Sequence, residues 1–138
     1  MRIAGSILLH LGLAALVGGM LFFGVVMAPL VFLHLPIGVA GPFIRGAFPW
    51  YYGYCVGAAG VTAVGLLLRR EFLALLVPVA IIGITAWLWL YLLPALDVMR
   101  AAHDAAGFAR GHRLAVWLNG AELLAAMVLL IKRAIKLH

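Results

Sequence analysis

Four long stretches without a basic residue constrain the fold of this 138-residue chain more than any other feature of its sequence. They hold one acidic residue between them and cover residues 3–44, 46–68, 72–96 and 114–131. Each is long enough for a helix that crosses the hydrocarbon core of a bilayer, which takes about 20 apolar residues. The chain is 67% hydrophobic and only 10% charged, whereas water-soluble domains are about 25% charged. We therefore expect an integral membrane protein in contact with the lipid bilayer.

The stretches predict an all-α fold with four transmembrane helices, at about residues 4–28, 48–68, 72–96 and 112–131. Proline disfavours helical geometry in the residue before it, so the first helix should end at Ala28 and Pro29. Pro49 should lie in the first turn of the second helix, where proline removes no internal hydrogen bond. Short connections make consecutive helices antiparallel neighbours. We expect one transmembrane domain, residues 1–138, folded as an up-down-up-down four-helix bundle.

Positive charges near the helix ends predict the orientation, because cytoplasmic loops carry an excess of Lys and Arg. One side of the membrane would hold Arg2, Arg69, Arg70, Lys132, Arg133 and Lys136. The other side would hold Arg45, Arg100, Arg110 and Arg113. This imbalance favours a multi-pass protein of the plasma (inner) membrane with both termini in the cytoplasm. The same charges are spread over helix ends rather than gathered on one polar face, so we expect no nucleic acid as a partner.

Small residues follow one another at helical spacing on the second predicted helix. Gly53 and Gly57 are four residues apart, and Gly60 follows. Such a groove lets two helices approach closely in lipid. It either packs inside the bundle or joins two copies into a homo-oligomer.

Aromatic residues gather toward the outer half of the predicted spans, at Trp50, Tyr51, Tyr52, Trp87, Trp89, Tyr91 and Trp117. They form either a belt at the membrane interface or the wall of a pocket for an apolar or ring-shaped ligand. Both interpretations are compatible with the sequence.

Two ionisable side chains, His10 and Glu122, lie inside the predicted spans. A charged group in hydrocarbon costs on the order of a few kcal/mol, so such residues are candidates for function. At 1.5 Å of rise per residue their depths differ by only roughly 5 Å, which lets them face each other. Ser6 lies one turn from His10, and Asn119 lies one turn from Glu122. These four residues predict a ligand or proton site between the first and fourth helices, or alternatively a polar clasp that only joins them.

A second polar group is expected at the outer surface and contains His34, Asp97, His103, Asp104 and His112. Imidazole and carboxylate ligands suit divalent transition metals, and the nearby Met27 and Met99 add affinity for copper(I). The group is either a metal or anion site or a set of solvated loop residues. His10 and His112 would lie roughly 15–20 Å apart along the membrane normal, too far to clamp one haem. His10 with another axial ligand is a candidate for haem binding.

Three segments together resemble a known family: LHLGLAALVGGMLFFGVVMAPLVF from Leu9 to Phe32, FPWYY from Phe48 to Tyr52, and FARGHRLAVWLN from Phe108 to Asn119. The chain is similar over nearly its whole length to the transmembrane protein 205-like family of uncharacterised four-helix membrane proteins. The matching positions are His10, Gly19, Ala28, Pro29, Phe32, Phe48, Pro49, Tyr51, His112 and Asn119. One departure is Ala115, where the family tends to have a small hydroxyl residue.

The resemblance implies an integral membrane fold with little settled chemistry. Eukaryotic members of that family are associated with drug resistance, which points to transport or trafficking. The first helix also resembles the copper-resistance D membrane domain and the haem-linked membrane protoporphyrinogen oxidases. These resemblances imply haem b or copper as cofactors.

Three hypotheses follow from the residues and the resemblance. The sequence holds no complete catalytic motif, so the first is a non-enzymatic membrane protein that binds or moves a small solute, ion or proton along the face of His10, Asn119 and Glu122. The second is a membrane redox or metal-handling protein that binds haem or copper. The third is a structural accessory subunit of a larger membrane complex.

Overall fold

The computed structural model describes residues 1–136 of the chain, and all its regular structure is helical. In chain order the elements are α1 (Arg2–Leu21), η1 (Phe22–Met27), α2 (Ala28–His34), α3 (Ile37–Arg69), α4 (Phe72–Trp87), η2 (Leu88–Leu92), α5 (Leu93–Ala101) and α6 (Ala105–Ile135). The segments η1 and η2 are wider, π-helical turns. No strand occurs in this described part, which agrees with the predicted all-α class.

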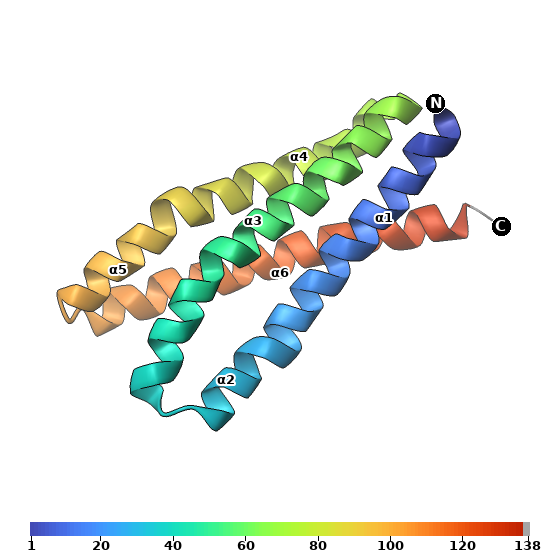
Figure 1. The fold of residues 1–138 in the computed structure, drawn as a ribbon. Coiled ribbons are helices and arrows are strands. Elements are labelled where there is room, and N and C mark those ends of the chain that lie inside the picture. Colours follow the sequence, from blue (N-terminus) through green and yellow to red (C-terminus); the bar gives the residue numbers. More distant parts are fainter. Residues whose placement is uncertain (137–138) are drawn as a thin grey trace.

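The elements join into four continuous rods (Figure 1). The first rod is α1, η1 and α2, the second is α3, the third is α4, η2 and α5, and the fourth is α6. Each rod is 30 to 33 residues long and apolar enough to cross a membrane. Four such helices indicate a multi-pass integral membrane protein, as the composition predicts.

The first rod extends to His34 instead of ending at Ala28, the end predicted from Pro29. Proline has no N–H and its ring clashes with the carbonyl four residues earlier, which in an α-helix is that of Val25. Here η1 precedes the proline, and the N–H of Ala28 bonds the carbonyl of Phe23, five residues back. The wider turn accommodates the ring, so the helix continues. The pair of η2 and Pro94 repeats this arrangement in the third rod, which reaches Ala101 rather than residue 96.

The second and fourth rods also begin before their predicted starts. The helix α3 starts at Ile37, not at residue 48, and contains both Pro42 and Pro49. The helix α6 starts at Ala105, not at residue 112, because Asp104 caps it by accepting a hydrogen bond of 2.9 Å from the Gly107 N–H. A helix satisfies its own backbone hydrogen bonds, whereas an apolar loop leaves them open in lipid, so helices replace most of the expected loops.

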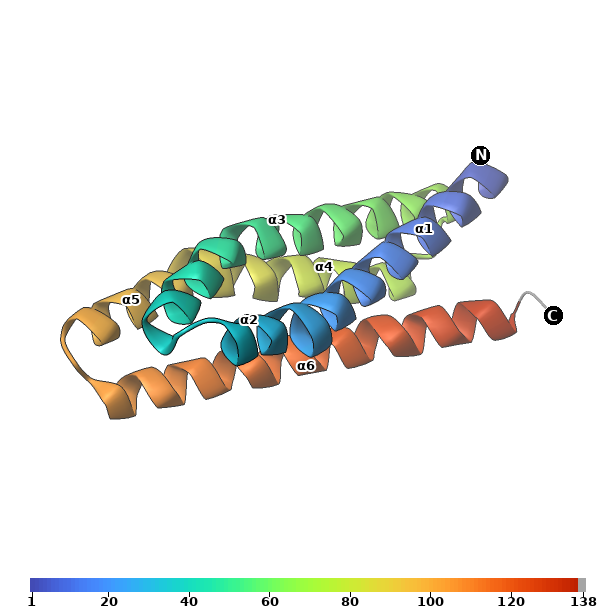
Figure 2. The same cartoon turned by 60° about the horizontal axis from the view of Figure 1, so that its bottom comes forward.

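Each rod packs against the next one in the chain, and the fourth rod also packs against the first. The helix α3 lies along α1 and along α4, and α6 crosses both α1 and α4. The N-terminus and the α3–α4 turn lie together at one end, while α2 and α5 diverge at the other (Figures 1 and 2). In Figure 2, α6 runs beneath the other three rods. The divergence of α2 from α5 leaves room between η1, α3 and α6.

Glycines make the close contact between α1 and α3. A Cβ atom on Gly12 would lie 2.5 Å from Thr62 Oγ1, and one on Gly65 would lie 2.5 Å from the Leu9 nitrogen. Small residues let two helix backbones approach in this way, which gives the packing attraction that lipid does not otherwise supply. This seam differs from the predicted groove, since Gly57 and Gly60 have open space at the Cβ position.

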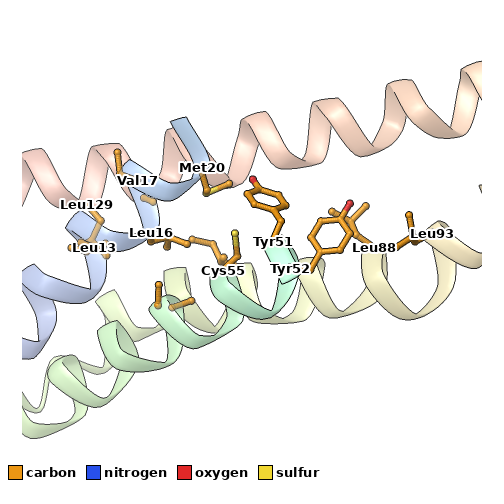
Figure 3. Close-up of a cluster of buried hydrophobic side chains, with 14 of the residues drawn as sticks. Leu13, Leu16, Val17, Met20, Tyr51, Tyr52, Cys55, Leu88, Leu93 and Leu129 are labelled. Atoms are coloured by element: carbon orange, nitrogen blue, oxygen red, sulfur yellow. The ribbon is translucent and has the colours of Figure 1, made fainter. Parts of the chain in front are cut away.

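The core of the bundle lies where α1, α3, α4 and α6 meet. Figure 3 shows side chains of this buried cluster, in which α1 contributes Leu13 and Leu16 and α3 contributes Tyr52 and Cys55. Leu129 of α6 belongs to the same cluster. Tight packing here fixes the rods against each other next to the cavity described below.

A charged cluster ties the turn between α3 and α4 to the end of α6. Arg69 Nε donates to Glu71 Oε1 at 2.7 Å, and Arg133 of α6 pairs with the other carboxylate oxygen. Burial raises the pKa of Glu71, but the hydrogen bond from Arg69 and the two positive charges outweigh it and hold that pKa below its ordinary value. Glu71 is therefore ionised at neutral pH and links three of the four rods.

Candidate functional site

A cavity of about 650 Å³ lies between η1, α3, α5 and α6, at the end where the rods diverge. Its charged rim consists of Arg45, Asp97 and Arg100, with His112 beside them; its aromatic wall consists of Phe23, Phe48, Tyr51 and Tyr52. Small-molecule sites in proteins have this size and this mixture of apolar surface with a few placed polar groups. The cavity is therefore the candidate functional site.

Arg45 and Asp97 join α3 to α5 at the rim. Arg45 Nε donates to Asp97 Oδ1 at 2.7 Å, and Arg45 Nη2 donates to Asp97 Oδ2 at 2.5 Å. Two parallel N–H to oxygen bonds fix the planes of both groups and are the strongest geometry for such a pair. The sequence predicted Arg45 only as a charge that sets orientation and Asp97 only as a metal ligand, so this pair was not predicted.

Arg100 lies over the ring of Phe108, with its guanidinium carbon 4.9 Å from the ring centroid. The His112 ring stacks on the same Phe108 at a centroid separation of 6.1 Å and an interplanar angle of 4°. Within residues 1–136 no carboxylate forms a salt bridge with Arg100. The rim therefore carries one positive charge that no protein group neutralises directly.

The aromatic wall is one connected stack. Phe23 of η1 lies parallel to Tyr51 at 4.2 Å, and Phe48 stacks on Tyr52 at 5.5 Å. Tyr51 and Tyr52 are 8% and 3% exposed, whereas Trp50 is 83% exposed. The aromatic residues thus divide between the two predicted roles, because Tyr51 and Tyr52 line a pocket while Trp50 points outward.

Two polar pairs join α6 to α3 and to α4, and the first of them lines the cavity. Tyr51 donates its hydroxyl hydrogen to Asn119 Oδ1 at 3.0 Å. One helical turn beyond Asn119, Glu122 is 3% exposed and accepts a hydrogen bond of 2.8 Å from Thr85 Oγ1 of α4. Thr85 is itself buried. The predicted residues Asn119 and Glu122 therefore do lie in a polar interior, but their partners come from α3 and α4.

His10 and Ser6 lie elsewhere, on α1. The His10 ring donates from Nδ1 to the carbonyl oxygen of Ser6 at 2.7 Å. Nε2 is buried and has no hydrogen-bond partner in the part of the chain that the structure describes. No hydrogen bond or ion pair joins His10 to Glu122 there. The expected four-residue face is thus divided into two separate pairs.

The residues predicted to bind a metal have separate local roles. Asp97 is paired with Arg45, Asp104 caps α6, and His34 bonds the carbonyl of Leu30 at 3.0 Å. His103 lies in the turn before α6 with a left-handed φ of 57°. Across the described chain, no three His, Cys, Asp or Glu side chains gather in an arrangement that could hold a metal ion. The structure therefore does not assemble the predicted copper or divalent-metal set.

A comparison with protein families bears on the same residues. The sequence pattern of a domain of unknown function (DUF4149) matches residues 11–105. The chain belongs to the DUF4149 family. The region shared with DUF4149 contains the aromatic wall and the Arg45, Asp97 and Arg100 rim, while His112, Asn119 and Glu122 lie beyond it on α6. No curated protein and no solved structure matches this DUF4149 chain, and no comparison supports the transmembrane protein 205-like family, the copper-resistance D domain or the protoporphyrinogen oxidases.

Proposed function

We propose that this DUF4149 protein binds a small amphipathic solute inside the membrane, in the cavity between η1, α3, α5 and α6. The observation that carries the proposal is the cavity itself, in which a charged rim and a continuous aromatic wall meet in about 650 Å³. An amphipathic molecule can satisfy both surfaces at once. A purely polar solute would leave the aromatic wall without a partner.

The proposal places the four rods across the bilayer in up-down-up-down order. A rod of about 30 residues is roughly 45 Å long, which matches a bilayer including its headgroups. The charged rim then lies near headgroup depth, since Arg100 is in the last turn of α5. The Lys and Arg distribution favours both termini in the cytoplasm of a cell with a plasma (inner) membrane. The rim then faces the outer leaflet.

A lateral opening supports entry from the lipid. The helix α2 packs against α3 rather than against α6. Val25 of η1 and Val116 and Gly120 of α6 line the cavity and are exposed. A solute dissolved in the membrane can therefore reach the aromatic wall between η1 and α6 without crossing the charged rim.

The proposal revises the polar face expected from the sequence. Asn119 bonds Tyr51, and Glu122, which was expected to face His10, bonds Thr85 instead. Tyr51 and Asn119 line the cavity and offer it hydrogen-bonding groups, while Glu122 and Thr85 are buried outside its lining. Binding in the cavity requires no movement of a proton or ion through Glu122.

Haem at His10 is the second candidate function. It is supported by the buried ring nitrogen Nε2, which has no hydrogen-bond partner in the described chain and is the kind of atom that serves as an axial ligand. Haem b would supply redox chemistry when bound. A Soret band in the purified protein that His10→Ala removes would establish this function, and its absence after expression with excess haem would exclude it.

A homo-oligomer is compatible with the outer face of α3. Gly57 is exposed and Gly60 has open space at its Cβ position, so a second copy could approach there. Gly53 instead faces Trp89 of η2, at 3.6 Å from a built Cβ. An accessory role in a larger membrane complex stays open on the same surface, and co-purification at fixed stoichiometry tests it.

The cavity can be tested by filling it. Gly120 lines the cavity and has open space at its Cβ position, so Gly120→Leu should fold normally and occupy the site. Gly83 of α4 also has open space, is exposed and lies outside the cavity, which makes Gly83→Leu a matched control. We expect decanoate, decanol or decyltrimethylammonium to raise the melting temperature of the parent and of Gly83→Leu, but not of Gly120→Leu. If no probe discriminates between the two variants, the cavity is not a binding site.

A further inference from the structure

We infer that the cavity selects an amphiphile with an anionic head group, which the guanidinium of Arg100 holds together with the free edge of Arg45. This inference rests on the proposed function and names the chemical class of its ligand. Such a ligand carries one negative charge on an alkyl chain. A free carboxylate amphiphile and an anionic membrane lipid both have this chemistry.

The charges that line the cavity are unequal. Two guanidinium groups, Arg45 and Arg100, face one carboxylate, Asp97. Both oxygens of Asp97 accept hydrogen bonds from Arg45, so the carboxylate is already engaged by that partner. The site therefore has one positive charge in excess and its single carboxylate is not free for a cationic head group.

Arg100 is oriented to receive an anion. Its guanidinium carbon lies over the Phe108 ring, 4.9 Å from the ring centroid, so the cation contacts the face of the aromatic ring. A guanidinium group carries five N–H donors, and those of Arg100 form no hydrogen bond among residues 1–136, so they are available to an oxygen anion. Phe108 is half-buried and is also stacked on His112, which limits the positions that Arg100 can take.

Arg45 provides a second donor edge. It uses Nε and Nη2 toward Asp97, and Nη1 has no hydrogen-bond partner among residues 1–136. Because Asp97 fixes the guanidinium plane, the position of Nη1 at the rim is fixed as well. An anion between Arg45 and Arg100 would thus meet donors from both α3 and α5.

The apolar part of the ligand follows from the rest of the lining. Below the rim lie the aromatic wall and the apolar side chains Val116 and Leu123 of α6. An alkyl chain would run along this wall toward the lateral opening at Gly120. The arrangement resembles a lipid molecule in its bilayer, with its charge at headgroup depth and its chain in the apolar interior.

The test measures binding of three probes with equal chain length and different charge. The protein is placed in phosphatidylcholine nanodiscs, and equilibrium binding of decanoate, decanol and decyltrimethylammonium is measured against empty discs. We expect decanoate to bind at least tenfold more tightly than the other two. Arg100→Gln should weaken decanoate about tenfold and leave decanol unchanged, since it removes charge-assisted hydrogen bonds only. Arg110→Gln is the matched control, because Arg110 is an exposed arginine of α6 outside the cavity.

The outcomes separate this inference from the proposed function. If Gly120→Leu blocks all three probes and the parent binds them equally, the cavity binds amphiphiles and the anionic preference is wrong. If Gly120→Leu has no effect on any probe, the cavity itself is refuted. If inorganic phosphate competes for the site as well as decanoate does, binding does not need an alkyl chain, and the inference of an amphiphilic ligand is wrong. Phosphatidylglycerol in the disc distinguishes a membrane lipid from a free amphiphile as the ligand. If phosphatidylglycerol competes with decanoate, the ligand is a lipid; if it does not compete, the ligand is a free amphiphile.

Discussion

Tyr51 of α3 donates its hydroxyl hydrogen to Asn119 of α6 across 3.0 Å, at the deep end of the cavity. The two helices share little other direct contact, since α3 packs mainly on α1 and α4. This hydrogen bond therefore links the aromatic wall to the helix that closes the cavity. It holds Tyr51 in the wall and orients the Asn119 amide at the surface of the cavity.

Removal of this hydrogen bond should weaken the bundle by a small, measurable amount. Tyr51→Phe keeps the ring stack with Phe23 and removes only the hydroxyl group. Hydrogen bonds between membrane helices contribute about 0.6 kcal/mol on average, so we expect a decrease of that size in the free energy of unfolding. Unfolding by sodium dodecyl sulfate in mixed micelles measures it. In a double-mutant cycle with Asn119→Leu, additive effects would show that the two side chains do not interact.

The ion pair at the rim should stabilise the contact between α3 and α5. Asp97→Asn removes the negative charge that pairs with Arg45. Both side chains are partly exposed, so we expect a loss of about 0.5–1 kcal/mol of unfolding free energy, the upper part of the range for exposed pairs. The loss should shrink at high salt, which screens exposed charges. The charge-swapped pair Arg45→Asp with Asp97→Arg is the control, and failure of the swap to recover any stability would argue against the pair.

The helical class and the number of rods could be predicted from the sequence because they depend on the number and length of the uncharged stretches. An uncharged stretch of sufficient length is stable in lipid only when its backbone is helical. The helix ends could not be predicted in the same way. Pro29 was interpreted as a stop, yet a π-helical turn before it lets the helix continue. The same pairing of a π-helical turn with a following proline occurs at η2 and Pro94, but a proline in the sequence does not distinguish such a turn from a helix end.

The site was predicted only in part, and for a geometric reason. Counting residues fixes the depth of a side chain, but successive residues on a helix are rotated by about 100°, so depth does not fix direction. His10 and Glu122 were therefore expected to meet, although Glu122 bonds Thr85. Asn119 and Glu122 are one turn apart on the same helix, but they bond different helices, Asn119 to Tyr51 and Glu122 to Thr85. Pairs between rods, such as Arg45 with Asp97, depend on tertiary packing.

The glycine seam between α1 and α3 should tolerate no added methyl group. In Gly12→Ala the new Cβ would lie 2.5 Å from Thr62 Oγ1 and 2.6 Å from the Thr62 backbone nitrogen. Separation of the helices would then disturb packing along the whole seam, and we expect a loss of about 1–3 kcal/mol. Gly57→Ala is the matched control, because the same change there meets no atom within 4 Å. Equal stability of both variants in micelle unfolding would contradict the close approach of the two helices.

Stability should fall in acid because of Glu71, at the end of the molecule opposite the cavity. Its pKa in the folded protein lies below the ordinary value of 4.5, since Arg69 and Arg133 outweigh the effect of burial. The unfolded state therefore takes up the proton first as the pH falls, and the ion pairs contribute fully only above that ordinary pKa. We expect the unfolding free energy to decrease as the pH drops from 4.5 through the folded pKa, and this slope should be reduced in Glu71→Gln. Unfolding in micelles between pH 3 and pH 7 measures both curves, and identical slopes below pH 4.5 would show that Glu71 does not stabilise the turn through its charge.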